Sequence, residues 1–268
     1  MRGAMHDMYD LAALERTLAG TVFAGKLHFS PATDSTNTDA LEAARSGAPH
    51  GSVYFADEQL AGRGRGDHKW DSTAGDGLYA SVLLRASIPA ARLPLLPLAA
   101  GLAAAEAIRD VARLAVDLRW PNDLLLGPRK FGGILVESKI SGGSAEFAVV
   151  GIGINVHQRA FASDLSTLAT SLDLEIERRI SRQDLLLSLL KSLQSETLLL
   201  ADSEVTVKIP ERVEKASTWI RGRRVEVHGP QACTGVTAGL DENGFLLVRT
   251  DSGIITVQTG GIRAAKIS

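Results

Sequence analysis

The sequence of 268 residues contains one cysteine, Cys233, and aromatic residues make up only 5% of it. A single thiol excludes a disulfide within the chain and a zinc site built from several cysteines. We expect Cys233 to be a buried or half-buried thiol in a reducing environment. The first residues, MRGAMHDMYDL, lack the apolar core of a signal peptide, so we predict a cytoplasmic protein.

The chain also lacks an excess of charge of either sign, since its formal net charge is −2 and 22% of its residues are charged. This balance argues against a protein that coats nucleic acid or binds an anionic membrane. It has no uncharged apolar run of about 18 residues, so we expect no membrane span. The length and the 45% of apolar residues suit a globular protein with one or two domains.

Apolar spacing and turn signals divide the chain into a larger mixed part and a smaller all-β part. In the mixed part, helical patterns cover 8–19, 38–45, 95–114 and, after a capping box at Ser181, the stretch to Leu200. Strand-like runs cover 22–29, 52–57, 78–84, 116–120, 133–137 and 145–156. Short strands with hairpin signals at Asn243-Gly244 and Ser252-Gly253 fill 222–267. We predict an α/β (α+β) domain over 1–218 and a small β-barrel domain over 219–268.

The stretch EQLAGRGRGDHKW, residues 58–70, combines glycine with positive charge directly after a predicted strand. Its alternating glycines allow the backbone to approach a ligand closely, and Arg63 and Arg65 can each grip a phosphate or a carboxylate. The stretch has neither the Walker pattern nor the third glycine of a dinucleotide fingerprint. It predicts an anion-binding loop that folds over its ligand. A flexible, solvated loop is the alternative.

Three further clusters place polar or small residues at strand ends and at a helix start. In RWPNDLLLGPRKFGGILVE, residues 119–137, a proline ends a strand and Lys130 can act as a point charge near phosphates. In GIGIN, residues 151–155, the glycines predict close packing against a strand, and Asn155 can contact an adenine or a ribose. DSTN, residues 34–37, offers hydroxyls and free N–H groups. In the first cluster, Asn122 and Asp123 can instead form Asx turns, and Lys130 can simply be solvated. The GIGIN glycines can instead mark a β-bulge, and DSTN can be a plain helix N-cap.

In this order the clusters resemble the biotin–protein ligases, the family of biotin–[acetyl-CoA-carboxylase] ligase. The matching motifs, between residues 34 and 156, are DSTN, E-Q-x-A-G-R-G-R, K-W, WPNDLLL, K-F-G-G-I-L-V-E and G-I-G-I-N-V. The resemblance implies a mixed-sheet catalytic domain like that of class II aminoacyl-tRNA synthetases, followed by an SH3-like barrel. It also implies that biotin and ATP, with Mg²⁺, form biotinyl-5′-AMP, from which biotin is transferred to a lysine of a carboxylase carrier domain. No tightly bound prosthetic group is expected.

The resemblance also assigns roles to individual residues. The catalytic cations would be Arg63, Arg65 and Lys130. Biotin would contact Ser35, Thr36, Asn37, Gln59, Gly62, Arg63, Lys130 and Gly133. The nucleotide would contact Arg65, Trp70, Asn122 and Asn155, and Asp123 would lie near Mg²⁺. The glycine-rich loop departs from the family pattern at one place, where Asp67 and His68 replace a glycine and a basic residue.

Three other functions compete with this interpretation. One branch of the family also represses transcription through an N-terminal winged helix-turn-helix, but residues 1–33 are too short for such a domain, so we predict no specific DNA binding. A lipoate–protein ligase shares the chemistry, although WPNDLLL and GRGR favour biotin. A ligand-binding protein without catalysis is disfavoured by Arg63, Arg65 and Lys130. We expect no membrane partner, and the sequence leaves a homodimer open.

Overall fold

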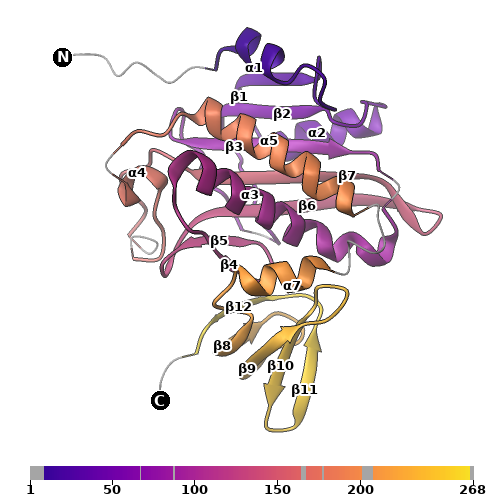
Figure 1. Ribbon diagram of the computed structural model, residues 1–268, viewed down its shortest axis with the longest axis vertical. Coiled ribbons are helices and arrows are strands. Elements are labelled where there is room, and N and C mark those ends of the chain that lie inside the picture. Colours follow the sequence, from indigo (N-terminus) through magenta and orange to yellow (C-terminus); the bar gives the residue numbers. More distant parts are fainter. Residues whose placement is uncertain are drawn as a thin grey trace.

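The computed structural model describes residues 9–66, 68–86, 88–163, 167–176, 178–200 and 208–265. Within these ranges the strands form a seven-stranded and a five-stranded sheet (Figure 1). The helices are α1 (Leu11–Thr17), α2 (Thr36–Arg45), a 3₁₀ turn η1 (Ala90–Leu95), α3 (Leu96–Ala112), α4 (Leu172–Glu175), α5 (Arg182–Leu199) and α7 (Lys208–Lys215). This is the mixed α/β fold with a small C-terminal β domain that the sequence predicted.

The larger sheet has the strand order β1-β2-β3-β7-β6-β5-β4. Its strands are β1 (Leu27–Thr33), β2 (Val53–Gln59), β3 (Gly77–Leu84), β4 (Asp117–Arg119), β5 (Asp123–Leu126), β6 (Arg129–Ser141) and β7 (Ser144–Asn155). β1 and β2 run parallel, and the other neighbouring pairs are antiparallel. The sheet is therefore mixed.

The two faces of this sheet carry different elements. α3 and α5 cross one face (Figure 1), where alternate residues of β3 such as Leu78 and Val82 enter the main apolar core. On the other face α2 packs through Ala40 and Ala44 against the next β3 residue, Leu83. Because side chains alternate along a strand, every second residue of the central strands belongs to the face that carries α2.

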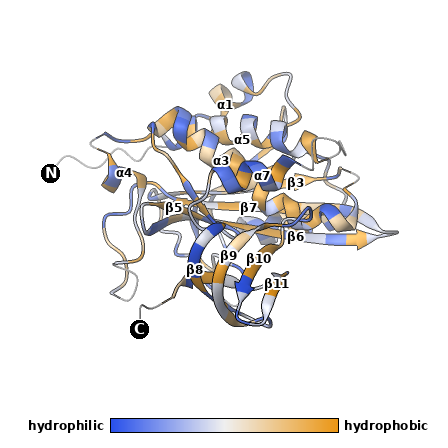
Figure 2. Ribbon diagram, turned by 60° about the horizontal axis from the view of Figure 1, so that its bottom comes forward, coloured by the Kyte–Doolittle hydropathy of each residue, from blue (hydrophilic) through white to orange (hydrophobic). Residues whose placement is uncertain are grey.

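α3 owes its apolar composition to the core. Ala90–Ala112 is the one helical stretch among the described residues that could cross a membrane by length and hydropathy alone. However, its buried residues belong to the same apolar core as β3, β6 and α5. Figure 2 shows α3, α5 and α7 on the same side of the sheet. Packing against the sheet and these helices therefore accounts for the apolar run.

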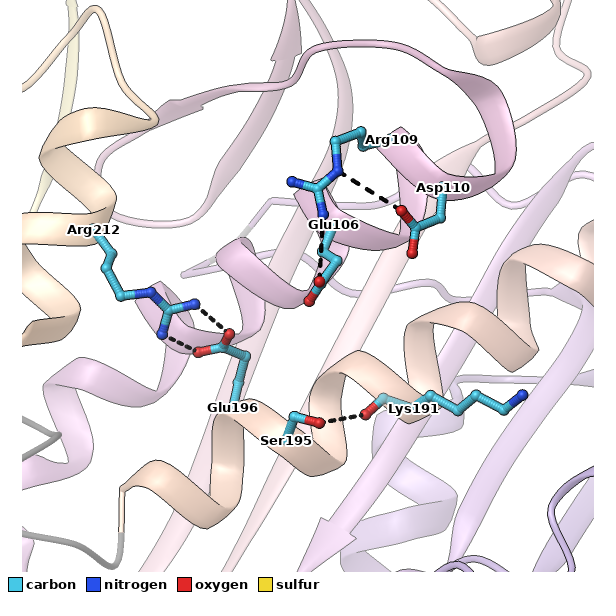
Figure 3. Close-up of polar contacts among 7 residues, drawn as sticks. All are labelled: Glu106, Arg109, Asp110, Lys191, Ser195, Glu196 and Arg212. Carbon is cyan, nitrogen blue, oxygen red and sulfur yellow. Dashed lines mark hydrogen bonds and ion pairs between the residues drawn. The ribbon is translucent and has the colours of Figure 1, made fainter.

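An ion pair ties α7 to α5 on that face (Figure 3). Arg212 of α7 donates from both terminal nitrogens to Glu196 of α5, once at 2.8 Å. Glu196 is only 4% exposed, and its hydrogen bond raises the pKa of Arg212. On α3, Arg109 lies 3.3 Å from Glu106 and 3.7 Å from Asp110. The pair between Arg212 and the buried Glu196 holds α7, from which the chain enters the second sheet.

The five-stranded sheet has the order β11-β10-β9-β8-β12. Its strands are β8 (Arg221–His228), β9 (Cys233–Leu240), β10 (Leu246–Thr250), β11 (Gly253–Val257) and β12 (Gly261–Ala264). Gly244 and Gly253 have positive φ in the two predicted hairpin turns. Trp120 Nε1 donates to Gly244 O at 3.0 Å, so this sheet is attached to the larger part. The domain boundary at 218/219 stays a prediction.

One predicted strand, over 22–29, is wrong in its first half. The chain turns there, through Gly20 with φ +82° and Gly25 with φ +68°, and β1 begins only at Leu27. Positive φ is costly for other residues and incompatible with a strand, so these glycines override the apolar pattern.

Two other predictions need correction. The stretch 121–132, left between two predicted strands, contains β5, and Gly127 with φ +56° turns the chain directly into β6. The helix predicted from 38 begins at Thr36. Ser35 occupies its N-cap position but makes no side-chain capping bond.

Candidate active site

Three glycines on neighbouring strands form a flat floor on the face of the sheet that carries α2. Gly133 of β6 pairs with Gly153 of β7, and Gly151 lies on the same face two residues earlier. A Cβ at Gly151 would lie 2.8 Å from Asn37 Cγ, and one at Gly153 would lie 2.7 Å from the Trp70 indole. At Gly151 and Gly153 the neighbouring groups pack too closely for any side chain, as the GIGIN motif predicted.

A chain of hydrogen bonds crosses the floor from Gln59 to Glu137. Gln59 Oε1 accepts from Thr36 N at 3.0 Å, and Thr36 Oγ1 lies 2.8 Å from Ser81 Oγ. Ser81 Oγ donates to Asn37 Oδ1 at 2.6 Å, and Asn37 Nδ2 donates to Glu137 Oε2 at 3.0 Å. Thr36, Asn37 and Ser81 are nearly inaccessible to solvent. The start of α2 therefore places neutral donors and acceptors in a buried polar network.

The glycine-rich loop closes on itself beside this network. Trp70 N donates to Gly62 O at 2.9 Å, and a Cβ at Gly62 would lie 2.8 Å from Ser72 Oγ. Ser72 Oγ in turn accepts from Gln59 Nε2 at 2.7 Å. Ser35, just before α2, is 2% exposed. The structure thus brings the predicted biotin contacts of α2 and those of the loop base into one region.

Lys130 stands at the start of β6 beside Asp123. Its Nζ lies 2.5 Å from Asp123 Oδ1 and 5.4 Å from the centroid of the Trp70 ring. Asp123 Oδ2 accepts from Arg119 at 2.7 Å. Burial raises the pKa of Asp123, but the charges and hydrogen bonds of Lys130 and Arg119 outweigh this and hold the pKa below 3.8. Asp123 is therefore a carboxylate at neutral pH.

The two loop arginines point to different partners. Arg65 donates to Gly260 O in the C-terminal β domain, and Asp123 also attracts it. Arg63 instead pairs with Glu137 at 2.7 Å. The structure therefore gathers Arg65 and Lys130 around Asp123 and holds Arg63 at the Glu137 end of the floor.

Asp123 does not form a metal site as it stands. Both of its oxygens accept from cationic side chains. Over the part of the chain that the structure describes, no three His, Cys, Asp or Glu residues come together as a metal site. The residues present do not fit a resident Mg²⁺ ion, and none of the catalytic roles assigned to this chain depends on one.

The two asparagines predicted to contact a nucleotide bind backbone carbonyls. Asn122 Nδ2 donates to Ile134 O at 2.7 Å, which ties the turn after β4 to β6. Asn155 Nδ2 donates to Thr170 O at 3.1 Å and is 8% exposed. Both amides help to build the site, and their contact with a nucleotide stays a prediction. Of the two departures in the loop, Asp67 lies outside the described residues.

Two site residues were missed by the sequence analysis. Ser81 is the one small polar residue in the apolar run LYASVLL, and its place in a fully buried strand is a signal for an internal hydrogen bond. Glu137 closes the motif KFGGILVE, but no local pattern indicates its partners. Asn37 and Arg63 reach it from elements far away in the sequence.

Comparison with known proteins identifies the family. Residues 29–155 match the model of the biotin/lipoate A/B protein ligase family. The bifunctional ligase/repressor BirA of Bacillus subtilis is 31% identical over 231 residues, which are 85% of this chain and 70% of that protein. The biotin–[acetyl-CoA-carboxylase] ligase of Mycobacterium tuberculosis is 31% identical over 236 residues, which are 86% and 85%.

The solved structures agree with the sequence comparison. The biotin protein ligase from Aquifex aeolicus in complex with biotin and ATP has a TM-score of 0.76 and 30% identity, covering 89% of this chain and 98% of that one. The sequence match and the fold therefore point to the same family. The chain belongs to the biotin/lipoate A/B protein ligase family.

Proposed function

We propose that this chain is an ATP-dependent biotin–protein ligase. In the first step a carboxylate oxygen of biotin attacks the α-phosphorus of ATP, pyrophosphate leaves, and biotinyl-5′-AMP forms. In the second step a lysine amine attacks the acyl carbon, AMP leaves, the amine loses a proton, and an amide remains. The relatives named as biotin ligases support this choice. The observation that carries it is the buried network of neutral polar groups on the glycine floor, with Lys130 at the Gly133 end of that floor.

The polar groups at the start of α2 suit a ligand that has a neutral polar ring and an apolar chain. Thr36, Asn37 and Gln59 offer hydroxyl and amide groups without net charge. Binding sites of this kind use a few placed polar groups in a largely apolar cavity to orient a ligand. We assign the ureido ring of biotin to this end, with the carboxylate toward Lys130.

The cations address the electrostatic problem of the first step. A carboxylate and a triphosphate are both anions, and joining them brings negative oxygens together. Lys130 and Arg65 share the region of Asp123. Fixed cations there offset the repulsion and stabilise charge that develops at the α-phosphate. Asp123 keeps Lys130 oriented until the phosphate competes for it.

The glycine-rich loop can shield the intermediate. A mixed anhydride hydrolyses in water, so its retention needs a cover. Arg63 and Arg65 extend from a backbone of glycines toward opposite ends of the site. We assign the loop to cover the adenylate and Trp70 to lie against the adenine.

Further parts of the proposal concern partners. The acceptor is a biotin carboxyl carrier domain of a carboxylase, and the reaction takes place in the cytoplasm. Mg²⁺ accompanies ATP on its phosphates, as is usual for nucleotide substrates. We propose that the chain does not bind operator DNA specifically. A gel-shift assay that shows tight, salt-resistant binding contradicts this part.

Substitution of Lys130 tests the assignment. In Lys130→Ala we expect the rate of biotin-dependent pyrophosphate release to fall about 10²–10³-fold. The affinity for biotin should fall by much less than the rate. Lys139→Ala is the matched control, because Lys139 lies on the same strand but pairs with Glu146 and is 58% exposed. An unchanged rate in Lys130→Ala refutes the role of Lys130, and thermal stabilisation by lipoate but not by biotin refutes the choice of substrate.

A further inference from the structure

A short segment, Leu168–Thr170, lies beside Lys130 beyond the end of β7. β7 pairs with β6 only as far as Gly132. Next to it, Lys130 N donates to Leu168 O at 2.8 Å, and Thr170 N donates to Lys130 O at 2.9 Å. We call Leu168–Thr170 the strap. It takes the place of a neighbouring strand and binds both backbone polar groups of Lys130.

The strap is held by buried side chains around Thr170. Thr170 is fully buried, and its carbonyl accepts from Asn155 Nδ2 at 3.1 Å. Its hydroxyl donates to Glu175 Oε1 at 2.5 Å. Arg129 Nη2 binds the same oxygen at 2.6 Å. Because Arg129 adjoins Lys130 in sequence, these contacts close a ring from Lys130 through the strap and Glu175 back to β6.

Lys130 needs this support because the ladder on its other side is irregular. Lys130 pairs with Leu125 of β5, but the register shifts between Leu124 and Leu125. A bulge re-aims side chains and weakens local pairing. Without the strap, the position of the Lys130 backbone would depend on this irregular pair alone. A misplacement of about 1 Å in a catalytic group can cost about 10²-fold in rate.

We propose that Thr170 is a positioning residue for Lys130. Its hydroxyl, through Glu175, and its carbonyl, through Asn155, fix the strap, and the strap fixes the backbone from which the ammonium group extends. The proposal rests on the function proposed for Lys130 in adenylate formation. Asn155 then affects the reaction indirectly, because its amide holds the carbonyl of Thr170.

The test measures pyrophosphate release in variants of the full chain. Thr170→Val keeps the shape of the side chain and removes the hydroxyl, and we expect kcat to fall about 10- to 100-fold while KM for biotin and ATP stays within about twofold. Thr170→Ser should restore most of the rate. Thr197→Val is the matched control, because Thr197 is a buried threonine of α5 whose hydroxyl binds only the backbone of its own helix.

The double variant Lys130→Ala/Thr170→Val separates the two proposals. If Thr170 acts through Lys130, the double variant is no slower than Lys130→Ala. Equal losses from Thr170→Val in both backgrounds, or no loss in the native background, overturn the positioning role. If Lys130→Ala releases pyrophosphate as fast as the native chain, the role proposed for Lys130 is wrong instead. If Thr170→Val does not fold, Glu175→Gln replaces it with the same expectations, because it weakens the hold on Thr170 and keeps the volume.

Discussion

Gly151→Ala is a sharp test of the glycine floor. The added Cβ would lie 2.8 Å from Asn37 Cγ and closer still to Oδ1, whereas real Cβ atoms essentially never come within 3.0 Å of such atoms. The backbone of β7 is paired on both sides, with β3 and β6, so it cannot move away. The Asn37 amide must therefore turn away, which breaks its bonds to Ser81 and Glu137.

The energetic cost of this change follows from the two hydrogen bonds that break. A neutral buried hydrogen bond contributes about 0.5–1.5 kcal/mol and one to a charged group about 1.5–3 kcal/mol. Overpacking adds about 1–3 kcal/mol. Because Glu137 is a quarter exposed, the lower values apply, and we expect a loss of about 3–5 kcal/mol in the free energy of unfolding. For a chain of this size this lowers Tm by about 6–20 °C.

Thermal melting and biotin titration check this prediction. The control is Gly101→Ala in α3, where the added Cβ would lie 3.6 Å from Leu118, an ordinary contact. Because glycine costs about 1 kcal/mol in a helix, Gly101→Ala should be neutral or stabilising. If Gly151→Ala melts and binds biotin like the native chain, the floor is not packed as described.

Two further predictions concern charge. Glu137→Gln should release Arg63 from the floor and speed tryptic cleavage after Arg63, by less than about fivefold because the pair is partly exposed. Glu146→Gln, on the neighbouring strand, should leave that cleavage unchanged, and equal effects in both would contradict the pairing. Burial lowers the pKa of His157 below 6.5, against the hydrogen bond to Asp173, which raises it. The unfolded chain therefore binds more protons as pH falls below about 6.5, and the free energy of unfolding should decrease there. Urea unfolding at pH 7.5 and 5.5 should show a smaller decrease in His157→Gln, and equal decreases would refute the assignment.

Much of the fold could be predicted from the sequence because its signals are local. Ser181 accepts from Asp184 N at the start of α5, as the capping box predicted. The hairpin turns at Gly244 and Gly253 also follow from nearest neighbours. β5 was missed because its existence depends on pairing with β4 and β6, which no short window reveals.

In the site, too, residue type could be predicted from the sequence, whereas contacts between distant residues could not. The loop with its arginines, Lys130 and the glycines of the floor stand out because residue type alone indicates their chemistry. The partners do not stand out, because Glu137 meets Arg63 and Thr170 meets Asn155 only after the sheet has formed. The sequence therefore predicted which groups carry the charge, while the contacts that hold them required the structure.

Transfer of labelled biotin to a purified carrier domain tests the central claim most directly. Because the cations act on the α-phosphate of ATP in the proposed first step, labelling should depend on ATP. One pyrophosphate should be released for each biotin attached. Labelling should be greatly slowed in Lys130→Ala and preserved in Lys139→Ala. Labelling that does not require ATP, or no labelling of any biotin carrier domain by the native chain, would contradict the account.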